Sequence, residues 1–143
     1  MKDTTIFEYD EVTGSSYCVI PYDGRTFEGV AHCHPDDVDF MSERVGMSIA
    51  EARAQIDILR YIRDCKIKPA LKTLRMLYSD ISNSKYHNPK SRETKMLQRR
   101  IYELEKELAT TNNEIADIRK FIKDYIDGKE RLYQRLRAKS NNN

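Results

Sequence analysis

The chain has 143 residues, of which 39% are hydrophobic and 34% are charged, and its formal net charge is +2. No apolar run approaches the ~18 residues that cross a bilayer, so we expect no membrane-spanning segment. The composition favours long helices over a compact globule. The first residues lack the basic and then apolar layout of a secretory signal, which predicts a soluble, cytoplasmic protein.

The charges are unevenly distributed along the chain. Residues 1–48 hold three basic and ten acidic side chains, a balance of −7, whereas residues 49–143 have a balance of +9. This predicts an acidic head and a basic body. The three cysteines, Cys18, Cys33 and Cys65, are odd in number and follow no secretion signal, so we expect reduced thiols rather than a disulfide framework.

The head has the pattern of antiparallel strands. The segments IFEY, SYCVIPY and RTFEGVAHC are rich in β-branched and aromatic residues. Asp23-Gly24 lies between the last two segments and is a strong hairpin signal. With these two residues as the loop, Tyr22 faces Arg25 and Cys18 faces Gly29. One face of the hairpin then carries Ile20, Cys18, Phe27, Ala31 and Cys33.

Helical signals follow Pro35. The segment VDFMSERVG indicates a short helix or turn closed by Gly46. Ser48 and Glu51 match the S-x-x-E capping box, which predicts the start of a helix over residues 48–82. Pro69 should kink or break that helix just before its own position.

The last helix is predicted from Asn88 as its N-cap and Pro89 as its first residue. A 3–4 apolar spacing then continues from Leu97 to Leu136, as in coiled coils. Two arrangements fit this pattern. Helix 48–82 can fold back on helix 89–123 as an antiparallel hairpin, or the long helix can associate in parallel with a second copy. Two paired hairpins would satisfy both.

These elements predict an α+β protein that is mostly α. A β-hairpin or small antiparallel sheet is followed by a long antiparallel helical hairpin with coiled-coil packing. The predicted parts are an acidic head over residues 1–47, a basic helical hairpin over residues 48–139 and a disordered tail over residues 140–143.

The segment EGVAHCHPDD contains candidate metal ligands. His32 and His34 share one face of a strand, which is how a strand can present two imidazoles to one metal. Cys33 points to the opposite face, and no C-x-x-C or second H-x-H supplies further ligands. We therefore expect a polar strand end with no metal or other cofactor, and we keep the His32–His34 pair as the alternative. No nucleophile, Walker or Rossmann motif occurs, so we expect no enzymatic activity.

The basic residues of the body form two groups, which an antiparallel hairpin would bring together at its distal end. Such a surface would attract phosphates or an acidic protein surface, and Tyr78 and Tyr86 could stack on bases. A plain solvated helix face is the other interpretation. The candidate binding residues are Arg60, Arg63, Lys68, Lys72, Arg75, Lys85, Lys90, Arg92, Lys95, Arg99 and Arg100.

The stretch from Asp23 to Ala54 resembles a class of small phage and prophage proteins of Gram-positive bacteria. Those proteins have a β-hairpin, a pattern close to G-x-A-x-C-x-P-x-D, a later glycine, an A-x-x-R-A helix start and a charged helical half. The resemblance implies a phage or mobile-element context and assigns no catalytic residues. The matching residues are Gly29, Ala31, Cys33, Pro35, Asp37, Gly46, Ala50, Arg53 and Ala54.

Together these observations predict a non-enzymatic, phage-type binding protein that docks on a host or phage macromolecule. Its most specific form is an anti-CRISPR-like inhibitor of a host antiviral defence system, acting in the cytoplasm of an infected or lysogenic bacterium. The alternative is a nucleic-acid-binding accessory protein that uses the basic distal part of the hairpin. We expect a host or phage protein, or a nucleoprotein, as partner and a homodimer formed through the long helix.

Overall fold

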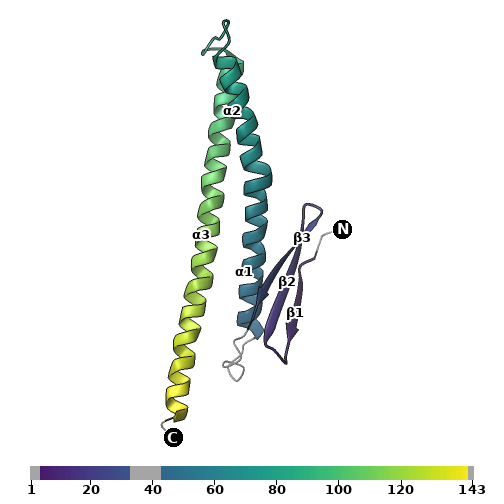
Figure 1. Cartoon of the computed structure of the whole chain (residues 1–143), viewed down its shortest axis with the longest axis vertical. Helices are drawn as coiled ribbons and strands as arrows, with labels where there is room; N and C mark the ends of the chain where they lie inside the picture. The colour runs from purple at the N-terminus through teal and green to yellow at the C-terminus, as the bar shows by residue number, and fades with distance from the viewer. Residues whose placement is uncertain (1–3, 33–42, 142–143) are drawn as a thin grey trace. The chain divides into compact units, whose positions relative to one another are not determined.

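A computed structural model describes residues 4–32 and 43–141 of the chain (Figure 1). It confirms the α+β class with mostly helical content: a three-stranded sheet precedes the long helices. The strands are β1 (Ile6–Asp10), β2 (Ser15–Tyr22) and β3 (Arg25–Ala31), and the helices are α1 (Glu43–Tyr61), the π-helix η2 (Ile62–Ile67), α2 (Lys68–Ser82) and α3 (Arg92–Asn141).

The chain packs as two compact units. The first contains Met1–Ile58 and Ala116–Asn143, and the second contains Leu59–Ile115. The sheet and the start of α1 therefore belong to the first unit, whereas η2, α2 and the first half of α3 belong to the second.

The sheet of the first unit is antiparallel with the strand order β1-β2-β3. The predicted hairpin register is confirmed, since Tyr22 pairs with Arg25 and Cys18 pairs with Gly29. Asp23 and Gly24 have φ values of 52° and 69°, the left-handed pair that a two-residue hairpin turn of type I′ requires. At the other turn, the Asp10 carboxylate accepts hydrogen bonds from the backbone N–H groups of Val12 and Thr13, which lower its pKa.

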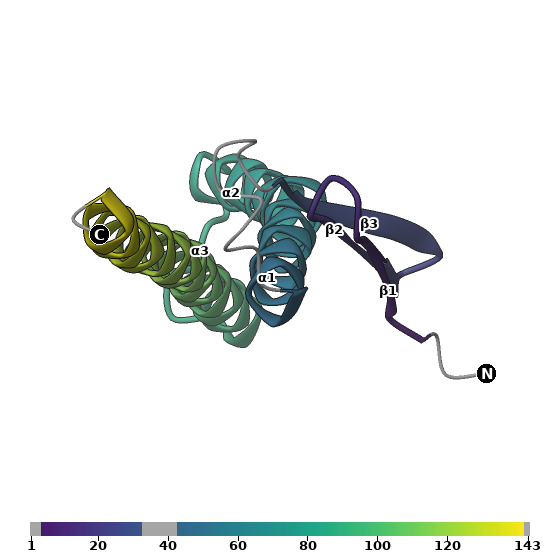
Figure 2. The ribbon, with the colours of Figure 1, turned by 90° about the horizontal axis from the view of Figure 1, so that it is seen from below.

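Small side chains allow the sheet to lie very close to α1 (Figure 2). A Cβ atom added at Gly29 would overlap the carbonyl oxygen of Ala50 and would lie 2.7 Å from the backbone nitrogen of Ala54. Ala50, Ala54 and Cys18 are fully buried in this contact region. The sheet and the helix thus meet backbone to backbone, which only glycine and alanine permit here.

Arg53 ties the edge strand β3 to the same helix. Its Nη1 donates a hydrogen bond of 2.6 Å to the carbonyl oxygen of Val30. Because β3 pairs with β2 on only one side, an edge carbonyl of this kind needs a partner outside the sheet. The guanidinium of Arg53 supplies that partner from α1.

The predicted helix start at Ser48 is wrong. Helix α1 already runs from Glu43, and Ser48 lies inside it, where its hydroxyl donates back to the carbonyl oxygen of Arg44 at 3.0 Å. Gly46 is also inside α1 rather than at the end of an element. A Cβ at Gly46 would overlap the Oγ of Ser16, so this glycine too serves the close packing between helix and sheet.

The predicted interruption before Pro69 takes the form of the π-helix η2. The backbone N–H of Lys68 bonds to the carbonyl oxygen of Arg63, five residues earlier. A wider π-turn directly before a proline relieves the clash that its ring would make with the preceding helical turn. The chain therefore stays helical from Glu43 to Ser82.

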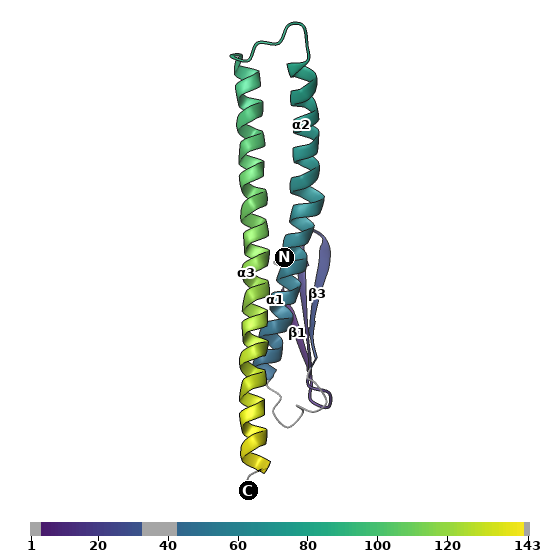
Figure 3. The same cartoon turned by 60° about the vertical axis from the view of Figure 1, so that its left-hand side comes forward.

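In the second unit, α2 and α3 run side by side and antiparallel, joined by the loop after Ser82 (Figure 3). Its core contains Ile67, Leu71 and Leu104, with Ile101 and Leu108 packed against them. The helical hairpin is thus formed within this unit by residues of the predicted heptad seam. Parallel self-association of the long helix would use the same seam positions, and it stays a prediction.

The predicted N-cap at Asn88 is wrong, because α3 begins at Arg92. Ser91 is the cap: its Oγ accepts a hydrogen bond from the backbone N–H of Thr94 at 3.2 Å. Asn88 instead forms a turn, in which its Oδ1 accepts from the N–H of Lys90 at 3.0 Å. At the other end, Ser140 and Asn141 lie in α3 rather than in a disordered tail, and residues 142–143 fall outside the described range.

Replacing Gly29 by alanine should destabilise the first unit. The added methyl group meets the backbone of α1, so strand and helix must separate, at a cost of about 1–3 kcal/mol. Chemical denaturation followed by circular dichroism measures this loss. Gly128→Ala is the matched control: a Cβ there meets nothing within 4 Å, and the substitution should raise helix stability by about 0.5–1 kcal/mol.

Replacing Leu71 by alanine should destabilise the second unit. Leu71 is 2% exposed and lies at the centre of the α2–α3 core, so truncation leaves a cavity that costs about 2–5 kcal/mol. Leu77→Ala, at a leucine that is 47% exposed on the same helix, is the control. Equal losses in the two denaturation curves would contradict the packing described here.

Candidate anion-binding surface

The structure divides the predicted basic residues by whether they have carboxylate partners. Five of them form ion pairs within the second unit. Arg63 Nε lies 2.9 Å from Asp64 Oδ1, and Arg75 Nη2 lies 3.0 Å from Glu105 Oε1. The other three are Lys68 with Asp64, Arg99 with Glu103, and Arg100 with Glu103 and Glu107.

These ion pairs neutralise part of the predicted surface. The hydrogen bond from Arg63, together with contacts from Lys68, lowers the pKa of the Asp64 carboxyl, which stays charged beside them. Arg63 also donates to Asn112 Oδ1 across the hairpin at 3.1 Å. These side chains join the two helices of the unit, and their charge is less open to an external anion. Arg60 is exposed on the last turn of α1.

A second group of cations has no carboxylate within ion-pair distance among the described residues. All five are exposed, and four of them surround the turn between α2 and α3. They are Lys72, Lys85, Lys90, Arg92 and Lys95. We call the four around the turn, with Tyr86, the hairpin tip.

Hydrogen bonds hold the backbone of the hairpin tip in one conformation. Thr94, which is 3% exposed, donates from Oγ1 to the carbonyl oxygen of Asn88 at 3.2 Å. The hydroxyl of Ser91 donates to Thr94 Oγ1 at 2.7 Å. The turn therefore presents its cations from a fixed frame, next to the positive end of the α3 dipole.

The two tyrosines of the predicted surface have different environments. Tyr86 is 86% exposed at the hairpin tip, and Lys85 Nζ lies 6.0 Å from the centre of its ring. Tyr78 is half-buried, and its hydroxyl oxygen accepts a hydrogen bond of 2.8 Å from Gln98 Nε2. Tyr86 is thus the ring that a base could stack on, whereas Tyr78 links the two helices.

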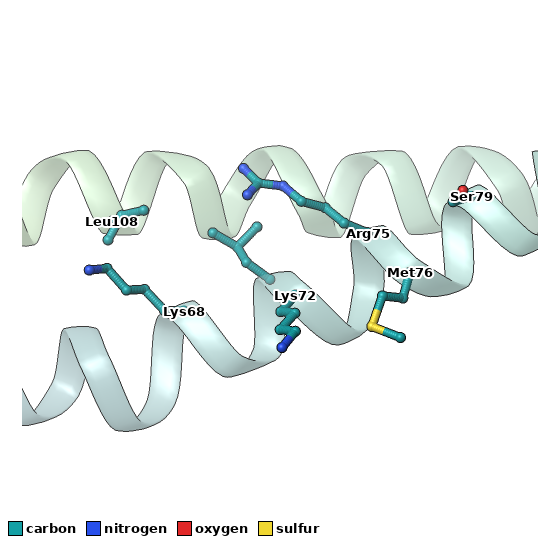
Figure 4. A pocket seen from close by; sticks show the side chains of 7 residues that line it. Lys68, Lys72, Arg75, Met76, Ser79 and Leu108 are labelled. Carbon is teal, nitrogen blue, oxygen red and sulfur yellow. The ribbon is translucent and has the colours of Figure 1, made fainter.

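A shallow hollow of about 510 Å³ lies on the side of the hairpin, away from the turn (Figure 4). Leu71, Met76 and Leu108 give it an apolar lining, and Lys68, Lys72, Arg75 and Ser79 complete it. We call it the lysine hollow. Sequence reasoning named its three cations but missed Met76, although Lys68, Lys72 and Met76 follow one another at the four-residue spacing of a helix face.

The predicted histidine pair lies only partly within the described residues. His32 is exposed, and its Nδ1 lies 3.0 Å from the hydroxyl oxygen of the buried Ser15. His34, Cys33 and the two aspartates that follow fall outside the described range. Among the described residues, no group of three or more histidine, cysteine, aspartate or glutamate side chains could hold a metal ion.

Comparison with known proteins gives no match to the chain among protein-family models, curated proteins or solved structures. Within the part of the chain that the structure describes, no helix combines the length and the apolar character needed to cross a membrane.

Two cysteines should differ sharply in reactivity. Burial, and secondarily the charge of Glu51, raises the pKa of the Cys18 thiol, which is fully buried; Cys65 is exposed. Maleimide labelling followed by peptide mass spectrometry should modify Cys65 quickly and Cys18 only on unfolding. Rapid labelling of Cys18 in the native protein would contradict the packing of the sheet on α1.

Proposed function

We propose that the protein is a non-enzymatic docking protein that binds an anionic macromolecule with its hairpin tip. The observation that carries this proposal is the set of four cations around one rigid turn, each without a carboxylate partner among the described residues. Elsewhere on the same unit, five of the predicted basic residues are paired with acidic side chains. An unneutralised basic surface lowers the free energy of any polyanion brought to it.

The resemblance to small phage and prophage proteins gives this proposal its context. In that context the protein would act in the cytoplasm of an infected or lysogenic bacterium and dock on a host or phage macromolecule. Inhibition of a host antiviral defence system is the most specific form of the proposal. Capture of partners from infected cells by the intact chain, compared with a tip-reversed variant, would test it.

Nucleic acid is the second candidate partner, and Tyr86 favours it. An exposed aromatic ring beside lysines is the arrangement with which proteins stack bases and contact the phosphates of a single strand. An acidic protein surface would use the lysines but gain little from the ring. The contribution of Tyr86 therefore separates the two partner classes.

Reversing two charges of the hairpin tip should abolish polyanion binding. The variant is Lys90→Glu with Lys95→Glu, and the probes are fluorescent single-stranded DNA and polyglutamate, followed by anisotropy at several salt concentrations. Binding of the wild type should weaken steeply with salt, because phosphate contacts release counterions. Lys106→Glu with Lys123→Glu makes the same change of net charge at exposed positions away from the turn and should bind like the wild type.

Tyr86→Ala then distinguishes the two partners. If the partner is a single strand, this change should weaken DNA binding by roughly 5- to 150-fold, the worth of one stacked base, and leave polyglutamate binding unchanged. If neither probe binds at low salt, or if the control variant loses as much binding as the tip variant, the hairpin tip is not a polyanion site.

A further inference from the structure

The first unit has an acidic counterpart to the lysine hollow. A hollow of about 400 Å³ lies between α1 and the part of α3 that belongs to this unit. Ala52, Ile118 and Phe121 give it apolar surface, and Glu51 and Asp117 give it negative charge. Phe121 is 48% exposed. We call this hollow, which Ser48 and Gln55 also line, the acidic hollow.

The acidic surface continues across α1 toward the sheet. A neighbouring hollow shares Ser48 and Glu51 with the first and adds the aromatic ring of Phe7, which is 40% exposed, and the carboxylate of Glu43. Arg44 is its one basic side chain. Glu43, Glu51 and Asp117 form no ion pair with other described residues, so their charge, like that of Lys72, is uncompensated within the described chain.

The exposed ridge of α2 in the second unit has the complementary chemistry. Lys72 and Met76 lie one helical turn apart at the edge of the lysine hollow, and both side chains point away from α3 (Figure 4). Met76 is 59% exposed. The ion pairs that hold Lys68 and Arg75 join side chains that are about half exposed. Such surface pairs contribute little free energy, so these cations can change partners when another carboxylate arrives.

The spacing between the charged and the apolar side chain is the same on the ridge of α2 and in the acidic hollow. Lys72 and Met76 are four residues apart on α2, and Asp117 and Phe121 are four residues apart on α3. Two helices laid together in that register would place the lysine on the aspartate and the methionine sulfur on the aromatic ring, a favourable contact. Glu51 lies on the other wall of the acidic hollow, within the reach of a further cation.

We propose that the acidic hollow is an interaction surface for a second copy of this chain, which inserts the Lys72–Met76 ridge of its α2. The contact is a helix-in-groove interface. It joins different surfaces of the two copies, so a pair keeps one free ridge on one copy and one free hollow on the other, and association can continue head to tail. It uses no residue of the hairpin tip, and it does not rest on the polyanion proposal.

Charge reversal on each side, alone and mixed, tests this interface. Lys72→Glu and Asp117→Lys both change exposed helix residues, and circular dichroism verifies that each variant folds. Sedimentation velocity at low salt, over rising protein concentration, should show self-association of the wild type that weakens with salt. Each variant alone should associate at least about tenfold more weakly, as expected for a lost close charge pair.

The mixture of the two variants is the decisive sample. The Lys72→Glu variant keeps the acidic hollow, and the Asp117→Lys variant keeps the basic ridge, so these two surfaces can bind each other. The reversed ridge and the reversed hollow are also opposite in charge. The mixture should therefore recover wild-type assembly. Lys106→Glu and Glu11→Lys change exposed charges away from both surfaces and should assemble like the wild type. A wild type that stays monomeric, a mixture that does not recover, or controls that lose as much assembly would each overturn the proposal.

Discussion

The contact between Gly29 and the backbone of α1 is the constraint on which the first unit depends. Because a Cβ at this position would overlap the carbonyl oxygen of Ala50, strand and helix approach closely only with glycine here and alanines opposite. The close approach brings the guanidinium of Arg53 to the carbonyl oxygen of Val30 and packs Ser16 against Gly46. It also fixes the orientation of α1, whose Glu51 and Ala52 line the acidic hollow.

This contact gives a structural explanation for the residues on which the resemblance to small phage proteins is based. Among its described residues, Gly29, Gly46, Ala50, Arg53 and Ala54 all take part in the packing of the sheet on α1. The pattern is therefore explained by the close packing of a hairpin on a helix. A pattern of this kind reflects the fold and does not by itself indicate the function.

Local signals predicted the fold where local physics decides it. Asp23-Gly24 predicted the hairpin register because this dipeptide readily adopts the left-handed pair of a type I′ turn, and the 3–4 apolar spacing identified the seam of α3. The helix starts predicted at Ser48 and Asn88 were wrong because the side chain of a capping residue can also form a hydrogen bond inside a helix or in a turn. Tertiary packing chose between these outcomes: Gly46 is held in α1 by the sheet, and Thr94, buried beside the turn, favours Ser91 as the cap.

For the basic surface, too, tertiary packing decides what the sequence alone does not. The sequence identifies each cation, but whether it is neutralised depends on the antiparallel register of α2 and α3, which brings Glu105 to Arg75 from thirty positions away. Only within that register do the unpaired cations separate into the hairpin tip and Lys72. A chain with a net charge of +2 can therefore have two surfaces of opposite charge, an acidic one beside the sheet and a basic one on the hairpin. Because net charge averages over both, it predicts neither self-association nor polyanion binding, and the local placement of the charges decides both.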